Sequence, residues 1–222
     1  MKYVLKKPAT LLFMVIVIIL GISIGYDVGS MGLLSTRLSV ITVRILILIS
    51  FIYMDFLVFR DLNSSMVLFR NKSLLKFFKS VIKIEMLLVF IFSLLLFIPI
   101  ILLNFSMFLK EFNYFVLMII NFNVVMTFCI CIVRLIDVGI NKRSLSSIIF
   151  ILSFIAIDLI MDEFYFDIIG LSSIFILPLE FNLVTYFLVL FVLITSIIMI
   201  TFLTLYEISR KDYLIKNEEV NI

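Results

Sequence analysis

Long apolar segments alternate with short polar ones along the whole chain. Six segments are almost purely apolar: residues 11–26, 41–59, 86–103, 114–133, 145–161 and 183–206. Each is close to the ~20 residues that a helix needs to cross ~30 Å of hydrocarbon. The pattern predicts an all-α integral membrane protein with six transmembrane helices, in which residues 1–222 form a single transmembrane domain.

Composition supports this prediction. Hydrophobic residues make up 64% of the 222 residues and charged residues 15%, whereas a soluble domain carries about 25% charge. Cys129 and Cys131 lie two positions apart in the fourth apolar segment, so on a helix they point in different directions and are poorly placed to pair. We expect both to be packed as small apolar side chains.

The Lys and Arg residues indicate the orientation in the membrane. Fifteen of the 18 lie at the two chain ends or in the second and fourth connections, and Arg134 is placed just after the fourth helix. Basic segments stay in the cytoplasm during insertion, so both termini are predicted to be cytoplasmic. This topology accounts for the net charge of +3, and no nucleic-acid partner is expected. A residue usage rich in Ile, Phe, Asn and Lys without Trp favours a bacterial cytoplasmic membrane.

Several kinds of chemistry lack their usual residues. The chain has no His, which removes the imidazole base or ligand of many proteases, proton relays and haem sites. Its six glycines form neither a GxxxxGK[ST] nor a GxGxxG loop, so no phosphate-binding loop is present. We expect no catalytic site, metal or cofactor in this chain.

The connection between the second and third helices is the longest and most basic. Residues 60–85 read RDLNSSMVLFRNKSLLKFFKSVIKIE. Lys72, Lys76, Lys79 and Lys83 share one face of a helix with apolar residues opposite, which predicts an amphipathic helix that continues into the third span. One interpretation is a helix lying on the membrane, with its lysines among anionic lipid head groups.

Residues 60–71 differ from this lysine-rich part. An apolar cluster at 66–69 is flanked by both signs of charge, with Arg60 and Asp61 before it and Arg70 after it. Such a short apolar ridge with a charged rim is typical of a protein docking surface. A cytoplasmic partner protein is therefore the sharper hypothesis for this segment.

The connection between the fifth and sixth helices, residues 162–182, has a short apolar centre broken by Gly170 and Pro178. It is too short to cross the bilayer, and acidic residues flank it at the outer interface. We predict a re-entrant hairpin that caps the outer end of a pathway; a plain interfacial segment is the alternative.

Polar residues inside the predicted spans are candidates for a substrate pathway or for helix packing. Ionisable groups there cost a few kcal/mol unless paired or hydrated. Asp55 is expected either to act in a pathway or to meet Arg60 or another basic group near the cytoplasmic interface, and Arg44 to reach the outer interface. The remaining candidates are Asn121, Asn123 and Asp158.

The arrangement resembles the permease subunit of a type 2 ABC transporter. The start Lys6-Lys7-Pro8 and the stretch MDFLVFRDLNSSMVLFRNKSLLKFF are similar to small permeases of bacteriocin or peptide-export systems in Gram-positive bacteria. The resemblance implies a coupling helix between helices 2 and 3 that contacts a cytoplasmic ABC ATPase, which supplies ATP hydrolysis. The implied interface residues are Arg60, Asp61, Met66, Leu68, Phe69, Arg70 and Lys72.

In this interpretation the chain is a non-catalytic exporter subunit that pairs with a second copy or a related permease. It lies among membrane lipids and moves an amphipathic peptide or lipid-like substrate outward. Two alternatives remain open: a stand-alone bacteriocin-immunity or peptide-sensing membrane protein, and the substrate-capture component of a vitamin importer. The outer half of the chain offers few polar residues for the pocket that the last of these requires.

Overall fold

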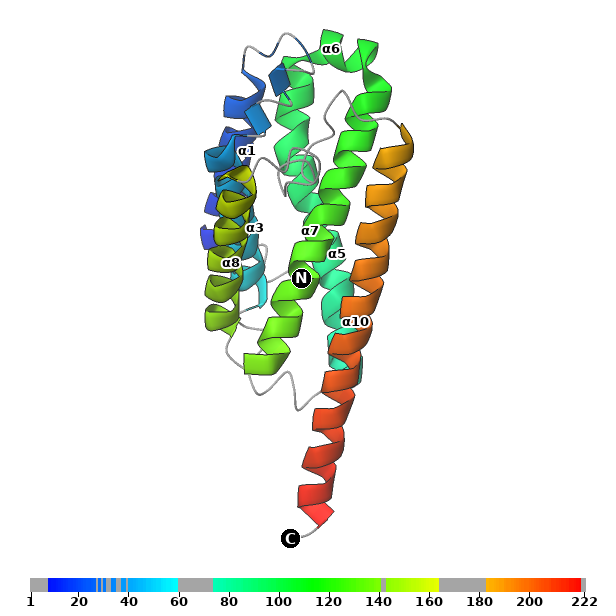
Figure 1. Cartoon of the computed structure of the whole chain (residues 1–222). Coiled ribbons are helices and arrows are strands. Elements are labelled where there is room, and N and C mark those ends of the chain that lie inside the picture. The colour runs from blue at the N-terminus through cyan, green and yellow to red at the C-terminus, as the bar shows by residue number, and fades with distance from the viewer. Residues whose placement is uncertain are drawn as a thin grey trace.

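The computed structural model describes residues 8–26, 28, 30, 33–34, 37–38, 40–59, 74–140, 143–163 and 183–220. Over these residues the chain is helical and has no strand, which confirms the all-α prediction. In chain order the helices are α1 (Pro8–Gly25), α3 (Ile41–Phe59), α5 (Leu74–Leu103), α6 (Phe105–Lys110), α7 (Phe112–Ile140), α8 (Arg143–Glu163) and α10 (Leu183–Val220) (Figure 1).

Each of the six apolar segments lies on one long helix, because a continuous apolar run in a helix can bury its surface on all sides. The helices extend beyond the predicted spans where polar residues continue the helical turn. α5 begins at Leu74, so the part of the lysine-rich segment that carries Lys76, Lys79 and Lys83 is helical and continues into the third apolar segment as predicted. α7 continues to Ile140 and α10 to Val220. The short helix α6 was not predicted.

Three of the described helices contain a stretch long and apolar enough to cross a membrane: Ser80–Leu103, Phe112–Ile140 and Tyr186–Arg210. Two more apolar stretches, Leu11–Gly25 and Ser144–Ile157, are shorter. These lengths support a membrane protein. Of the predicted outer hairpin, residues 164–182 lie outside the described part of the chain, and its first two residues belong to α8.

The long helices run side by side as an elongated bundle, and α6 lies at the end where α5 turns into α7 (Figure 1). We call this the α6 end, and the opposite end, where α5 begins and α7 finishes, the α5-start end. α10 packs against α7 and α5 and extends beyond the other helices at the α5-start end (Figure 1).

Aromatic side chains connect α3, α5 and α7 in the core. Phe92 on α5 meets Phe51 of α3 edge to face at 5.1 Å and stacks on Phe122 of α7 at 6.3 Å between ring centroids. Phe97 adds an edge contact to Phe122 at 5.2 Å. All four side chains are buried, and such geometry adds about 0.5–1.5 kcal/mol per pair beyond area burial.

Glycines let α1 lie directly on α5. A Cβ at Gly21 would collide with the backbone oxygen of Leu96, and one at Gly25 would come within 2.9 Å of the Cα of Ile100. The spacing of these glycines is the small-xxx-small pattern that lets helix backbones approach in membranes. Asn104 completes the contact by donating from Nδ2 to the carbonyl of Gly25 at 2.7 Å.

Two basic residues near the α6 end have structural roles. Arg37 donates from Nη1 to the carbonyls of Ile24, at 3.3 Å, and of Tyr26, so its charge satisfies the end of α1. Arg44, expected to reach the outer interface, is only 3% exposed. That prediction was wrong: the Arg44 side chain is buried, as are Leu34 and Leu38 before α3.

Candidate functional site

A group of charged side chains lies inside the bundle toward the α5-start end. Arg134 on α7 is 5% exposed, and it pairs with Glu85 on α5 and Asp55 on α3, which are 2% and 3% exposed. Asp137, three residues further along α7, is the third carboxylate on the same guanidinium. We call these four residues the charge cluster.

Each edge of the guanidinium is used. Nε and Nη2 of Arg134 both contact Oε1 of Glu85. Nη2 also lies 3.4 Å from both carboxylate oxygens of Asp55, and Nη1 lies 3.3 Å from Oδ2 of Asp137. Arg offers five N–H donors in a planar fork, so one side chain can hold acceptors from several directions.

Local sequence explains how the cluster forms. Arg134 and Asp137 are three residues apart on α7, which places them on neighbouring positions of the helix surface. Glu85 lies on α5 eleven residues after its start at Leu74, and Asp55 lies on α3 four residues before its end at Phe59. The cluster therefore lies about one turn inside the end of α3 and about three turns inside the start of α5, the two helix ends that flank residues 60–73.

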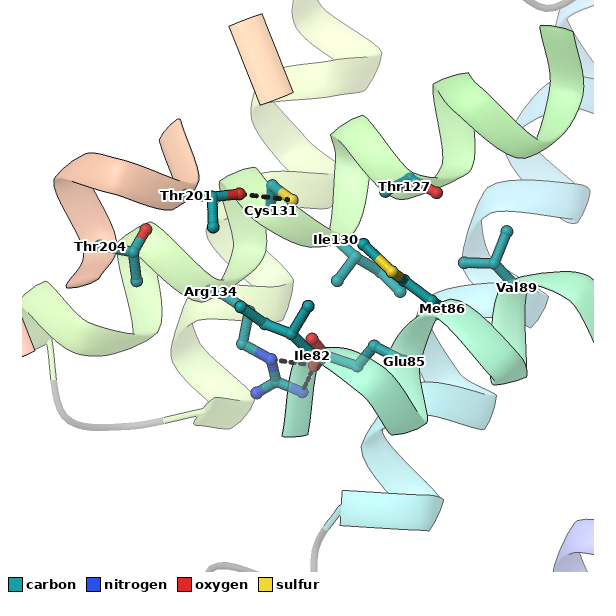
Figure 2. A pocket seen from close by; sticks show the side chains of 10 residues that line it. All are labelled: Ile82, Glu85, Met86, Val89, Thr127, Ile130, Cys131, Arg134, Thr201 and Thr204. Atoms are coloured by element: carbon teal, nitrogen blue, oxygen red, sulfur yellow. Dashed lines mark hydrogen bonds and ion pairs between the residues drawn. The ribbon is translucent and has the colours of Figure 1, made fainter. Parts of the chain in front are cut away.

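A small cavity opens beside the charge cluster (Figure 2). Its volume is about 50 Å³, and it lies between α5, α7 and α10. A volume of this size has room for a few water molecules, since one water needs about 10–15 Å³ by a comparable measure. Glu85 and Arg134 form its charged wall, and Figure 2 shows their side chains meeting at its rim.

Hydroxyl and thiol groups make up the rest of the polar lining. Thr127 and Cys131 come from α7, and Thr201 and Thr204 come from α10. The Cys131 thiol lies 3.7 Å from the hydroxyl of Thr201, which connects the two helices across the cavity (Figure 2). Thr127 and Thr204 donate to carbonyls of their own helices, so their oxygens still have acceptor capacity on the cavity side.

A second, larger cavity has a different character. It is a groove of about 400 Å³ on the α1–α5 contact, lined by apolar residues such as Ile18, Ile22, Ile98 and Leu102. No charged or hydroxyl side chain of the described residues lines it. Its chemistry suits hydrocarbon, either a lipid chain or the apolar part of a substrate.

The structure brings one sequence candidate into the charge cluster. Asp55 meets a basic group, as one of its two interpretations required, but the partner is Arg134. Arg134 itself was predicted to lie in a connection after the fourth helix. That placement was wrong, because α7 continues to Ile140 and carboxylates from α3 and α5 satisfy the charge inside the bundle.

The other candidates lie elsewhere. Asn123 donates from Nδ2 to the hydroxyl of Ser93 at 3.0 Å and so joins α7 to α5, as expected of a packing residue. Asn121 is buried on α7, and Asp158 belongs to α8, where only its helical backbone is described. The interface residues expected from the resemblance lie outside the described part of the chain: Arg60, Asp61, Met66, Leu68, Phe69, Arg70 and Lys72.

Sequence reasoning missed the roles of Glu85, Arg134 and Asp137. One signal was present: Arg134 is flanked by Val133, Leu135 and Ile136, and an oppositely charged residue follows at the third position. A charge pair at this spacing inside an apolar run is typical of a continuing helix. The carboxylates from α3 and α5 carry no such signal, because their distance to α7 depends on the fold.

The chain was compared with models of protein families, with curated proteins and with solved structures, and none of them matches it.

Proposed function

We propose that the chain is the membrane-spanning permease subunit of an ATP-driven exporter, working with a separate cytoplasmic ABC ATPase. One observation carries the proposal: α5 is a continuous helix from Leu74 to Leu103, so the lysine-rich segment and the third apolar segment form one rigid element. A push on residues 60–73 would act directly on a helix that lines the bundle core.

The proposal includes a specific topology. Six helices cross the bacterial cytoplasmic membrane, both termini are cytoplasmic, and the α5-start end faces the cytoplasm. In this proposal the coupling helix lies between helices 2 and 3, with residues 60–71 as its contact with the ATPase, and residues 164–182 form an outer hairpin. A second permease, identical or related, completes the transporter. The bias of basic residues toward the chain ends and the second and fourth connections supports this orientation.

The substrate is an amphipathic peptide or lipid-like molecule. The described helices present apolar surfaces, and the α1–α5 groove of about 400 Å³ offers only apolar walls. Among the described residues the buried charged side chains are Asp55, Glu85 and Arg134 in the charge cluster and Arg44 near the α6 end. A strongly polar substrate would find few partners along such a route.

Retention of an ATPase tests the proposal. The tagged chain is purified from its native membranes in mild detergent, and ATP hydrolysis of the purified material is measured. We expect the parent to retain hydrolysis and a variant with Arg60, Asp61 and Arg70 changed to Ala to lose it by about tenfold or more, since one lost charged contact is worth about 1.5–3 kcal/mol. Lys110→Ala, at the α6 end, is the matched control and should behave as the parent.

The same variants separate the exporter from the stand-alone alternative. An autonomous immunity or peptide-sensing protein needs no ATPase contact, so it would protect cells equally well with Arg60, Asp61 and Arg70 replaced. A parent chain that purifies intact and folded but never carries ATP hydrolysis would refute the exporter proposal.

A further inference from the structure

The charge cluster joins α3 to α7, two helices that pack mainly on other helices and share α8 as a neighbour. α3 lies mostly against α1 and α8, whereas α7 lies mostly against α10, α8 and α5. Arg134 reaches from α7 to Asp55 on α3 and to Glu85 on α5. Its long side chain therefore bridges α3 and α7 at the end of the bundle where α3 stops and α5 starts.

The contacts of Arg134 are of two kinds. The pairs with Asp55 and Glu85 cross between helices, so they break when the helices separate. The pair with Asp137 lies within α7, at 3.3 Å, and moves with Arg134 whatever the other helices do. Asp137 is also the most open member, with 16% of its side chain exposed.

This difference changes the cost of separation. A buried guanidinium that loses its only partner is strongly destabilised, because the charge is left without compensation in a medium of low polarity. Arg134 does not reach that condition when α3 or α5 moves away, since Asp137 remains beside it. The adjacent cavity of about 50 Å³ gives the released groups room for water.

We propose that Arg134 is a releasable clasp between α7 and the pair α3 and α5, with Asp137 as the acceptor that keeps the guanidinium paired in the separated state. Asp55 and Glu85 hold the clasped state, and Asp137 stabilises the released one. Asp55 lies four residues before the end of α3, and Glu85 lies eleven residues after the start of α5, the two helices that flank residues 60–73. The clasp deepens the proposed function and rests on it for the source of movement. A push by the ATPase on residues 60–73 would move α3 or α5 and so pull on the contacts of Arg134.

Two isosteric substitutions are expected to shift the ratio of released to clasped protein in opposite directions. Asp55→Asn removes a charge that favours the clasped state, so the ratio of released to clasped protein should rise. Asp137→Asn leaves the guanidinium with Asp55 and Glu85 in the clasped state but removes the carboxylate that stays beside it on release, so the same ratio should fall. A charged hydrogen bond contributes enough for each change to be about tenfold. A merely structural role for the cluster would shift both variants in the same direction.

The distance between α3 and α7 measures this ratio. Spin labels are placed on the full chain in lipid nanodiscs at Ile49→Cys, on the outward face of α3, and at Gly139→Cys on α7, where no atom lies within 4 Å of an added Cβ. Cys131 is changed to Ser and the buried Cys129 is kept. Double electron–electron resonance then reports the short and long distance populations.

We expect the long-distance population to grow in Asp55→Asn and to shrink in Asp137→Asn. Glu111→Gln, a carboxylate-to-amide change just before α7 at the α6 end, is the matched control and should leave both populations as in the parent. If Asp55→Asn does not give folded protein, Asp137→Asn decides alone, because it keeps both pairs between helices.

Equal shifts in both variants, or no shift in Asp137→Asn, would overturn the clasp. This outcome is distinct from failure of the exporter proposal, because the labelled chain is measured without an ATPase. If the distance populations shift as expected but the chain never retains ATP hydrolysis, the clasp is supported and its assignment to an exporter is refuted.

Discussion

Removing Arg134 tests the energetic basis of the charge cluster. Arg134→Leu places an apolar side chain in α7 and leaves the buried carboxylates of Glu85 and Asp55 without the guanidinium. Breaking a buried ion pair from one side costs about 3–5 kcal/mol. For a chain of this size about 2–4 °C of melting temperature corresponds to each kcal/mol, so we expect a fall of about 6–20 °C.

The chain carries its own reporter for this measurement. Cys129 lies on α7, is free and is 2% exposed. With the partly buried Cys131 changed to Ser, a thiol-reactive fluorogenic dye therefore stays dark until the helices separate on heating and expose Cys129. Lys83 is an exposed basic residue on α5, two positions before Glu85. Lys83→Leu is the control and should change the free energy of unfolding by less than about 0.5 kcal/mol.

A double-mutant cycle decides whether Arg134 and Glu85 act as a pair. Glu85→Leu alone should cost about 1.5–3 kcal/mol, because Arg134 keeps Asp55 and Asp137. In the double variant the buried carboxylate and guanidinium disappear together, so the loss should be smaller than the sum of the single losses by about 1.5 kcal/mol or more. Additive losses, or an Arg134→Leu midpoint equal to that of Lys83→Leu, would refute a coupled buried pair.

Two further predictions concern the contact between α1 and α5. Gly21→Ala should cost about 1–3 kcal/mol in the same thermal assay, because the new Cβ collides with the backbone of Leu96. Gly139→Ala has open space around the new Cβ and should stabilise the chain by up to about 1 kcal/mol. Equal effects would mean that α1 does not lie on α5 at Gly21. Asn104→Ala should cost about 0.5–1.5 kcal/mol through the lost hydrogen bond to the Gly25 carbonyl, and unchanged stability would contradict that bond.

The length and apolarity of the segments predict most of the fold. A run of about 20 apolar residues has one stable solution in hydrocarbon, a helix that satisfies its own backbone, so each predicted segment lies on a helix. The ends were harder to predict. At Arg134 the apolar run breaks, which predicts a helix end and a charge in water, yet α7 continues because Glu85 and Asp55 on other helices pair with the charge.

The sequence pattern does not show which part of the chain each residue contacts. The spacing of Gly21 and Gly25 is visible in the sequence, but only the fold shows that the surface they accept is the backbone of α5. Arg44 illustrates the same limit. Its position near a predicted helix end suggests an interfacial side chain, whereas the fold leaves it only 3% exposed.

The position of Arg134 also changes how the basic residues are interpreted. It no longer counts as a determinant of topology, yet 14 basic residues on the predicted cytoplasmic side still outnumber the three on the other. Apolar side chains of similar volume would stabilise a bundle about as well as a buried ion pair, so stability alone is a weak reason for four charged groups on three helices. Two of the pairs cross between helices, whereas the acceptor Asp137 moves with the guanidinium, and this combination instead favours a contact that is made and broken.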